Sequence, residues 1–249
     1  MSKGEIMRDH LLDLVSHTHD LGCIDAIKIV GTDSSTKIDS VAVDQSVVLQ
    51  AKFLAPVAEF IGTFGMPNLD KLKILLNLTE YRENAEITVN RQKRNDVEVP
   101  VGLHFRNQAG DFENDYRFMT AEVVAEKIKT AKFRGANWNI EFQPTVASVQ
   151  RLKMQAQANA DFSVFDVSTE GTNLKFTFGD HSTHAGEFIF HSDVTGSLTS
   201  VRKYPVRQVI SILDLVGDKV MRIADDGAMQ ITVDSGIVIY TYTLPAHSK

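Results

Sequence analysis

Several features are scarce in this sequence of 249 residues: it has one cysteine, no long apolar run and no excess of positive charge. A lone cysteine, Cys23, cannot form an internal disulfide, so we expect a reducing, cytoplasmic compartment. The apolar runs are far shorter than the roughly 20 residues that cross a bilayer, which argues against a membrane-spanning helix and a membrane partner. The first residues carry charges instead of an apolar core, so we also expect no secretory signal.

The charge balance limits the class of binding protein. Lys and Arg number 26 against 32 Asp and Glu, which gives a formal net charge of -6. This balance argues against a simple basic nucleic-acid binder but leaves room for a local basic surface. With 43% apolar and 23% charged residues, the composition is that of a folded globular protein rather than a disordered one. The length suggests one large or two medium domains.

Sequence motifs of catalysis are absent as well. The chain has no phosphate-binding glycine loop, no dinucleotide-binding glycine pattern and no nucleophile elbow. His17, His19 and Cys23 lack the fourth ligand of a known structural zinc pattern, so we expect no metal and no other cofactor. We therefore expect a protein that is not an enzyme.

Two groups of titratable residues leave an enzymatic alternative open. Asp225 and Asp226 precede a glycine, which is typical of a turn, although paired carboxylates also serve as acid and base. His181, His184 and His191 lie in or beside a predicted loop and strand, where surface histidines are common. The alternative is an active site built from these aspartates and the first two histidines.

Four segments show the i, i+3, i+4 apolar spacing of a helix that packs on a core. They are residues 5–15, 53–64, 145–159 and 206–216. Aligning Leu54 with Val206 superposes further apolar positions and brings Gly65 onto Gly217, which suggests that the chain contains two copies of one unit. The alternative is that two amphipathic helices share this periodicity without kinship.

Strand signals, mostly short alternations of apolar and polar residues, lie between and after these helices. The predicted strands are 26–30, 85–89, 99–105, 115–119, 137–142, 173–178, 187–190, 228–233 and 237–243. The last two form a hairpin closed by a turn at 234–236, and the polar segment 90–97 is predicted to be a loop.

The order of these elements predicts an α+β fold with two similar domains, each with two helices packed on antiparallel sheet. The first domain covers residues 1–119 and the second covers 137–249. Residues 120–136 form an interdomain connector that is rich in lysine, and a short helix at 121–131 is the alternative for part of it.

Positive charge gathers in the second half of the chain. The helix predicted at 145–159 has two cations and no carboxylate, and the region 202–216 has three cations and one carboxylate. A helix of about 12 residues is about 18 Å long, so its polar face can lie across several phosphates of a duplex. The first two predicted helices have no positive excess. The alternative, which charge alone favours, is that all these residues form ordinary solvated helix faces.

Residues 226–246 resemble the final hairpin of sliding clamps of the proliferating cell nuclear antigen type, with an aromatic closing strand and a proline-containing tail. Residues 150–155 and 173–190 resemble the sliding clamps of T-even-type bacteriophages and their relatives. With the two pairs of predicted helices, the whole chain resembles a DNA polymerase sliding clamp, which is a processivity factor. The likeness is stronger in the second half.

This resemblance implies a homotrimeric ring in which the helices of all subunits line a hole around double-stranded DNA. Contacts to phosphates hold such a ring on DNA without reading the base sequence. The residues expected to face DNA are Arg151, Lys153, Arg202, Lys203 and Arg207, with Arg8 and Lys52 as weaker candidates.

The resemblance also implies an apolar pocket beneath the connector that binds a short C-terminal peptide of a DNA polymerase. Aromatic and aliphatic side chains there would bury one or two anchor residues of the peptide. The matching positions are Phe118, Met119, Val123, Val124, Tyr242, Leu244, Pro245 and Ala246, and packing in the core is the alternative for each of them.

Further expectations follow from the same resemblance. A clamp loader ATPase would open the ring, and a phage-encoded clamp would work in the host cell cytoplasm and could also support late transcription. The alternative function is a non-enzymatic, β-rich virion structural or assembly protein, which would also form oligomers and lack an active site.

Overall fold

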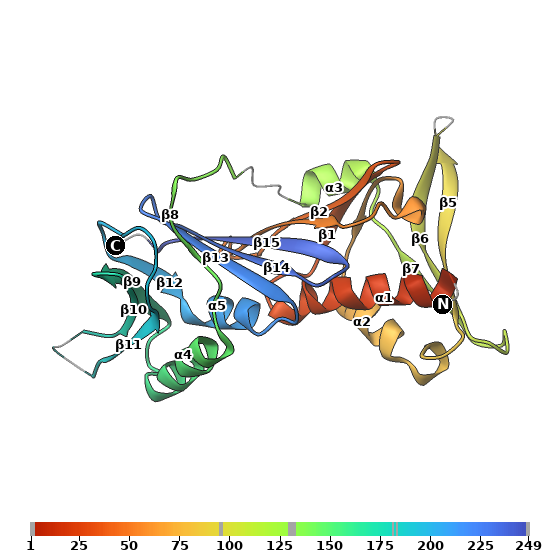
Figure 1. The fold of residues 1–249 in the computed structure, drawn as a ribbon. Coiled ribbons are helices and arrows are strands. Elements are labelled where there is room, and N and C mark those ends of the chain that lie inside the picture. The colour runs from red at the N-terminus through yellow and green to blue at the C-terminus, as the bar shows by residue number, and fades with distance from the viewer. Residues whose placement is uncertain (1–2, 95–96, 129–132, 181, 183, 248–249) are drawn as a thin grey trace. The chain divides into compact units, whose positions relative to one another are not determined.

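The computed structural model describes residues 3–94, 97–128, 133–180, 182 and 184–247. The chain forms two compact units, which Figure 1 shows coloured along the chain. The first unit contains residues 1–45, 49–131 and 235–240, and the second contains 46–48, 132–234 and 241–249. Within the described residues, no helix is long and apolar enough to span a bilayer.

The first unit contains two sheets, one of them extended by the beginning of the C-terminal strand. The first sheet has the order β4 (Gly62–Met66), β1 (Ile27–Thr32), β2 (Ser35–Val41), β3 (Val48–Phe53), followed by the start of β15 (Val238–Pro245). The second sheet has the antiparallel order β5 (Glu86–Arg94), β6 (Val97–Arg106), β7 (Glu113–Arg117). The helices are α1 (Lys3–Ser16), α2 (Leu69–Asn77) and α3 (Ala121–Lys127), with short 3-10 helices η1 (His19–Leu21), η2 (Ala58–Phe60) and η3 (Thr79–Tyr81).

The second unit also contains two sheets. The end of β15, β14 (Ala228–Asp234), β13 (Asp218–Ala224) and β8 (Trp138–Phe142) form one. The other has the antiparallel order β11 (Gly186–His191), β10 (Asn173–Phe178), β9 (Val164–Glu170), β12 (Arg202–Pro205). The helices are α4 (Val146–Ala158) and α5 (Val206–Leu213).

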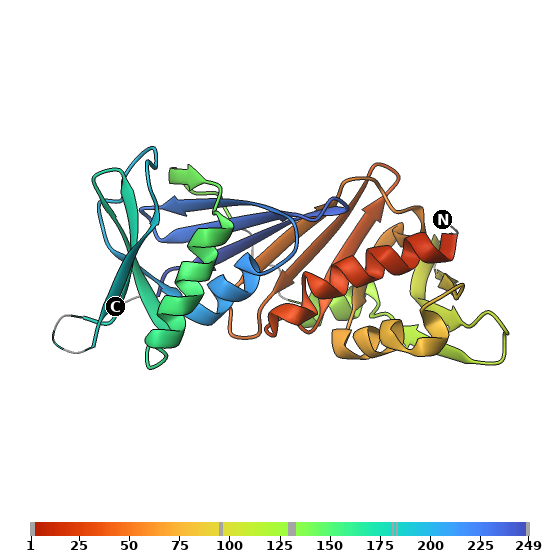
Figure 2. The same cartoon turned by 60° about the horizontal axis from the view of Figure 1, so that its bottom comes forward.

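In both units, helices pack beside each other and on strands. Figure 2 shows α1 beside α2 and α4 beside α5, and α4 also packs against β11. The core of the second unit is an aromatic cluster in which the Phe176 ring lies 4.7 Å from that of Phe165 and 4.3 Å from that of Phe190. Burying an aromatic side chain of this size stabilises a fold by roughly 1.5–3 kcal/mol. The alternation of buried and partly exposed residues along β10 places Phe176 and Phe178 on its buried face.

Three of the four predicted helices are confirmed. Segment 5–15 lies within α1, 145–159 corresponds to α4, and 206–216 corresponds to α5, which ends at Leu213. The side chain of Thr145 caps α4 by accepting a hydrogen bond from the Ser148 backbone N–H at 3.0 Å. This cap explains why the helix begins where its apolar pattern begins.

The helix predicted at 53–64 is wrong. The segment covers the end of β3, η2 and part of β4. Phe60 packs at 6.2 Å from Phe53 and at 5.8 Å from Phe64, so aromatic packing around a short 3-10 turn produces helix-like spacing. Gly62 has a φ of 126°, which is incompatible with an α-helix.

The second helix of the first unit is α2, at residues 69–77. Its buried face consists of four leucines, Leu69, Leu72, Leu75 and Leu76, and this spacing is a helix signal that the sequence analysis missed. The alignment of Leu54 with Val206 is therefore wrong, because it pairs a loop with a helix.

The predicted strands are confirmed as β1, β5, β6, β7, β8, β10, β11, β14 and β15, whereas β2, β3, β4, β9, β12 and β13 were missed. The loop predicted at 90–97 is wrong over most of its length, because β5 continues to Arg94 and β6 begins at Val97. An exposed hairpin tolerates this polar composition, since Arg91 donates to the Glu98 carbonyl at 3.3 Å across the strands.

The α+β class and the antiparallel sheets are confirmed. The short helix considered at 121–131 exists as α3 over 121–127, and residues 129–131 lie outside the described residues. The domain limits 1–119 and 137–249 stay a prediction.

Candidate functional site

Helix α4 presents cations without any carboxylate. Its buried face includes Val149 and Leu152, and its sequence contains Arg151 and Lys153 as the charged residues. The Arg151 guanidinium lies 5.3 Å from the centre of the Phe188 ring and donates to the Ile189 carbonyl at 3.2 Å. These contacts hold Arg151 over β11 while it keeps its positive charge.

The other cation of α4 is paired. Lys153 Nζ lies 2.5 Å from a carboxylate oxygen of Asp214, the C-cap residue that follows α5. Helix α5 itself carries Arg207, which is exposed, on the side opposite its buried Val209 and Ile212. The second unit therefore has one helix with two cations and a neighbour with one.

Arg202 and Lys203 lie on β12 and not on a helix, because the chain is extended up to Pro205. Lys203 Nζ pairs with Asp166 across the sheet at 2.9 Å. Arg202 donates to the backbone carbonyl of Asp225. Both predicted DNA-facing residues are thus engaged with neighbouring parts of the unit.

In the first unit, the predicted cations have different settings. Arg8 donates from α1 to the Leu76 carbonyl of α2 at 3.0 Å, whereas Lys52 is exposed on β3. Helix α2 adds two cations that the sequence analysis did not propose, exposed Lys71 and half-buried Lys73. They were missed because the helix was placed too early in the chain.

A cavity of about 280 Å³ lies in the first unit between the end of β2 and the end of α3. Its lining consists of Asp25, Ala26, Ser40, Val41, Ala42, Val43, Gln45, Lys127 and Ile128. The turn after β2 projects Val43, which is 84% exposed, and Gln45 closes this turn with a φ of 59°. An exposed aliphatic side chain beside an apolar hollow is suited to an anchor residue of a peptide.

The connector residues predicted for a peptide pocket do not line this cavity. Phe118 stacks on Phe64 at 4.5 Å, and Met119 exchanges two backbone hydrogen bonds with Gly65. Val124 is buried in the first unit, and Val123 is half-buried. Phe118 lines a different cavity of about 390 Å³ beside β6.

The tail residues predicted for the pocket belong to the second unit. Tyr242 and Leu244 are fully buried there, so packing in the core, the alternative for these residues, describes them in this structure. Pro245 is exposed, and Ala246 donates its backbone N–H to the Gly227 carbonyl at 2.7 Å. Sequence alone could not separate buried tail residues from exposed ones.

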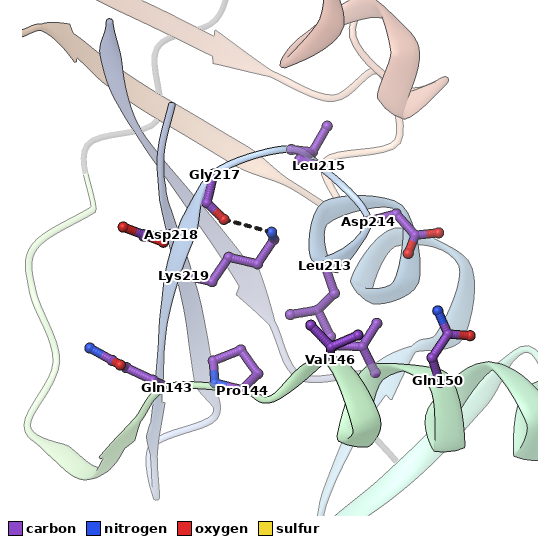
Figure 3. A pocket seen from close by; sticks show the side chains of 11 residues that line it. Gln143, Pro144, Val146, Gln150, Leu213, Asp214, Leu215, Gly217, Asp218 and Lys219 are labelled. Carbon is purple, nitrogen blue, oxygen red and sulfur yellow. Dashed lines mark hydrogen bonds between the residues drawn. The ribbon is translucent and has the colours of Figure 1, made fainter. Parts of the chain in front are cut away.

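A third cavity, of about 490 Å³, lies in the second unit between the start of α4, the end of α5 and the start of β13 (Figure 3). Lys219 points into it and donates to the Gly217 carbonyl at 2.9 Å. Burial lowers the pKa of Lys219, and the nearby carboxylates of Asp214 and Asp218 oppose that shift.

The residues of the enzymatic alternative are arranged as turn and loop contacts. Asp225 accepts hydrogen bonds from Thr199 N at 2.8 Å and Thr199 Oγ1 at 3.0 Å, and its own N–H donates to Asn139. His181 lies outside the described residues. Among the residues that the structure describes, no group of His, Cys, Asp and Glu is arranged to hold a metal ion.

Comparisons with known proteins show the fold. No family model matches the chain, and no curated protein matches its sequence. Among solved structures, it is similar to the proliferating cell nuclear antigen (PCNA) of A. fulgidus, solved with the C-terminal region of FEN-1 bound, at 10% identity and a TM-score of 0.67 over 99% of this chain and 96% of that one.

Two further structures agree. PCNA from Thermococcus kodakaraensis matches at 10% identity and a TM-score of 0.66 over 99% of this chain and 98% of that one. The proliferating cellular nuclear antigen of Entamoeba histolytica matches at 8% identity and a TM-score of 0.64, covering 97% and 95%. The chain therefore has the fold of a PCNA-type clamp along nearly its whole length.

Proposed function

We propose that this protein is a sliding clamp, a scaffold without catalytic activity that encircles duplex DNA and tethers a DNA polymerase to its template. The observation that carries this proposal is the match of both units, in order and nearly end to end, to the clamp fold of PCNA. A fold alone admits several functions. The cations gathered on α2, α4 and α5 favour DNA among them.

The proposed assembly is a homotrimeric ring. Two units of similar plan in each chain supply repeated helix pairs, and closing the ring removes exposed sheet edges by pairing them between copies. Three chains of 27.7 kDa give about 83 kDa. Light scattering over a wide concentration range should return this mass, and a dimer at every concentration would contradict the ring.

The proposed DNA face comprises Arg151, Lys153, Arg202, Lys203, Arg207, Arg8 and Lys52, to which we add Lys71 and Lys73 because they lie on α2. Such cations neutralise phosphates and release counterions, so binding is independent of sequence and weakens as salt rises. Exposed Arg207 and Lys71 are the strongest of these candidates, because their charged groups are open to a ligand.

The proposed partner site is the cavity lined by Val41, Val43 and Ile128. A FEN-1 C-terminal region is bound to the PCNA of A. fulgidus. By analogy, we infer that a C-terminal peptide of a DNA polymerase binds this chain. We also propose that a clamp loader ATPase opens the ring. The protein would be encoded by a phage, work in the host cytoplasm and have a role in late transcription.

Primer extension tests the function directly. The polymerase and clamp loader from the same source copy a long primed circular template while excess unlabelled DNA traps every polymerase that dissociates. With this protein, products should lengthen severalfold, and omission of the loader should abolish the gain on circular but not on short linear templates. Product lengths that do not change on addition of the protein would refute the clamp and favour a structural role.

A further inference from the structure

In each unit, a lysine of one helix forms an ion pair with an aspartate that follows the other helix in the chain. In the second unit, Lys153 of α4 lies 2.5 Å from Asp214, the C-cap residue of α5. In the first unit, Lys73 of α2 lies 2.8 Å from Asp20, which belongs to η1 directly after α1. This type of ion pair thus occurs twice. The lysine is on the first helix in the second unit and on the second helix in the first unit.

These pairs are poor candidates for holding the helices together. The Lys153 and Asp214 side chains are 35% and 43% exposed, and Lys73 and Asp20 are 43% and 38% exposed. Ion pairs this accessible to water contribute little to folding, because water screens the attraction and two long side chains lose freedom. Packing of apolar residues such as Leu152 and Leu72 already fastens α4 and α2.

The pairs matter more for a ligand that competes for the same lysines. A phosphate that approaches Lys153 competes with the carboxylate of Asp214 for its charge, and a phosphate that approaches Lys73 competes with that of Asp20. Each aspartate is therefore a counter-ion that is attached to the protein. Without it, the lysine could contact a DNA phosphate.

We propose that Asp214 and Asp20 act as tethered counter-ions that keep the grip of this protein on duplex DNA weak and thereby favour sliding. The inference rests on the proposed clamp function and adds a role for two acidic residues within the cationic helix pairs. Removing either carboxylate frees one lysine, so the number of neutralised phosphates rises by about one and the binding becomes more dependent on salt.

The test measures binding of the full-length protein to a fluorescent duplex of about 30 base pairs at 50–200 mM NaCl by anisotropy. The variants are Asp214→Asn, Lys153→Met and the double variant, which form a double-mutant cycle. We expect Asp214→Asn to steepen the plot of log affinity against log salt by about 0.9, a gain of about threefold in affinity at 50 mM relative to 200 mM.

The double variant shows whether the aspartate acts through the lysine. With Lys153→Met present, Asp214→Asn should change neither the affinity nor the slope by more than a small, general charge effect. Asp161→Asn is the matched control, because Asp161 is an exposed residue in the turn after α4 and its replacement removes the same charge. Asp20→Asn with Lys73→Met repeats the cycle in the first unit.

Two results would overturn the inference: an Asp214→Asn slope equal to that of the unmodified protein or of Asp161→Asn, or a gain that persists in the Lys153→Met background. Failure of the clamp function is separate, since it shows as unmodified protein that does not lengthen primer-extension products. Thermal melting followed by circular dichroism confirms that each variant is folded, as the exposure of these pairs predicts.

Discussion

The first helices of the two units, α1 and α4, differ in what their charged residues contact. In α1, Asp13 accepts hydrogen bonds from Ser235 Oγ at 3.0 Å and from Tyr240 Oη at 2.8 Å, and so ties the helix to the C-terminal hairpin. Arg8 donates to the Leu76 carbonyl at 3.0 Å and ties it to α2. The charges of α1 therefore serve the packing of their own unit.

Helix α4 uses its charges differently. It has no carboxylate, Arg151 is exposed, and Lys153 meets only a partly exposed aspartate across the surface. Buried apolar residues such as Val149 and Leu152 fasten this helix, and its two cations make contacts at the surface, where a ligand can reach them. The comparison shows that equivalent helices of the two units can have different roles. The charged residues of one helix stabilise the fold, and those of the other are presented at the surface.

The largest expected effect tests the structural role of α1. Asp13→Ala removes the acceptor shared by Tyr240 and Ser235 inside the first unit, and should lower the free energy of unfolding by about 3 kcal/mol. Urea denaturation measures this loss. Asp9→Ala in the same helix is the control and should cost about 0.5 kcal/mol or less. Equal losses in the two variants would show that the Asp13 network does not distinguish α1.

The next effect tests the ligand role of α4 and α5. Reversing Arg151, Lys153 and Arg207 to Glu should weaken duplex binding at least about 30-fold at 50 mM NaCl, about 2 kcal/mol, while the mass of the protein in light scattering stays that of the unmodified chain. The matched control reverses three cations on strands, Arg106, Lys175 and Arg222, with the same change in net charge. If both triple variants bind equally poorly, total charge and not the helix face controls binding.

A smaller effect tests whether the partner peptide binds to the first unit or to the second. Val43→Glu places a charge at the cavity of the first unit and should weaken binding of the polymerase C-terminal peptide about tenfold, about 1.4 kcal/mol. Val216→Glu is the control in the second unit, where an exposed valine of similar accessibility lies outside that cavity. Anisotropy with a labelled peptide measures both, and an equal loss with Val216→Glu would place the peptide elsewhere.

The smallest effect concerns pH and again belongs to α1. Burial lowers the pKa of His10 below its ordinary value of 6.5, although Asp13, Asp9 and Glu59 oppose the shift. The unfolded chain then binds the proton more readily than the folded one, so stability should fall as pH drops through 6.5 towards the folded pKa. His10→Gln should reduce the slope of the unfolding free energy against pH in this range, by an amount that corresponds to a fraction of a proton. An unchanged slope would rule out His10 as the cause of this pH dependence.

The successes and failures of the sequence analysis have local causes. Helix α4 was predicted because its apolar period lies within one stretch of chain, and the hairpin of β14 and β15 because its turn separates two alternating runs. The prediction of a helix at 53–64 was wrong because the phenylalanines of this segment have helix-like spacing along the chain. They belong to strands and a turn, and they pack together in the core. The error also hid α2 and its two lysines.

The prediction of the candidate site also succeeded in some parts and failed in others. The cations of α4 and α5 were named from the sequence, but Arg202 and Lys203 were placed at a helix when they lie on a strand with partners of their own. The proposed peptide cavity includes Lys127 and Ile128 of the predicted connector, but it also includes residues of the turn after β2, such as Val43, that gave no recognisable signal in the sequence. Turn residues carry little periodicity, so a sequence pattern cannot find them.

By itself, the sequence determined the fold class, the C-terminal hairpin and the positive character of α4, because these depend on residues close together along the chain. Tertiary structure alone decided which lysines are paired, since Asp214 reaches Lys153 and Asp20 reaches Lys73 only after the helices pack. It also decided where the cavity opens, because Val43 and Ile128 meet across the fold. Ion pairs and cavities form between surfaces, and local periodicity carries no information about which surfaces meet.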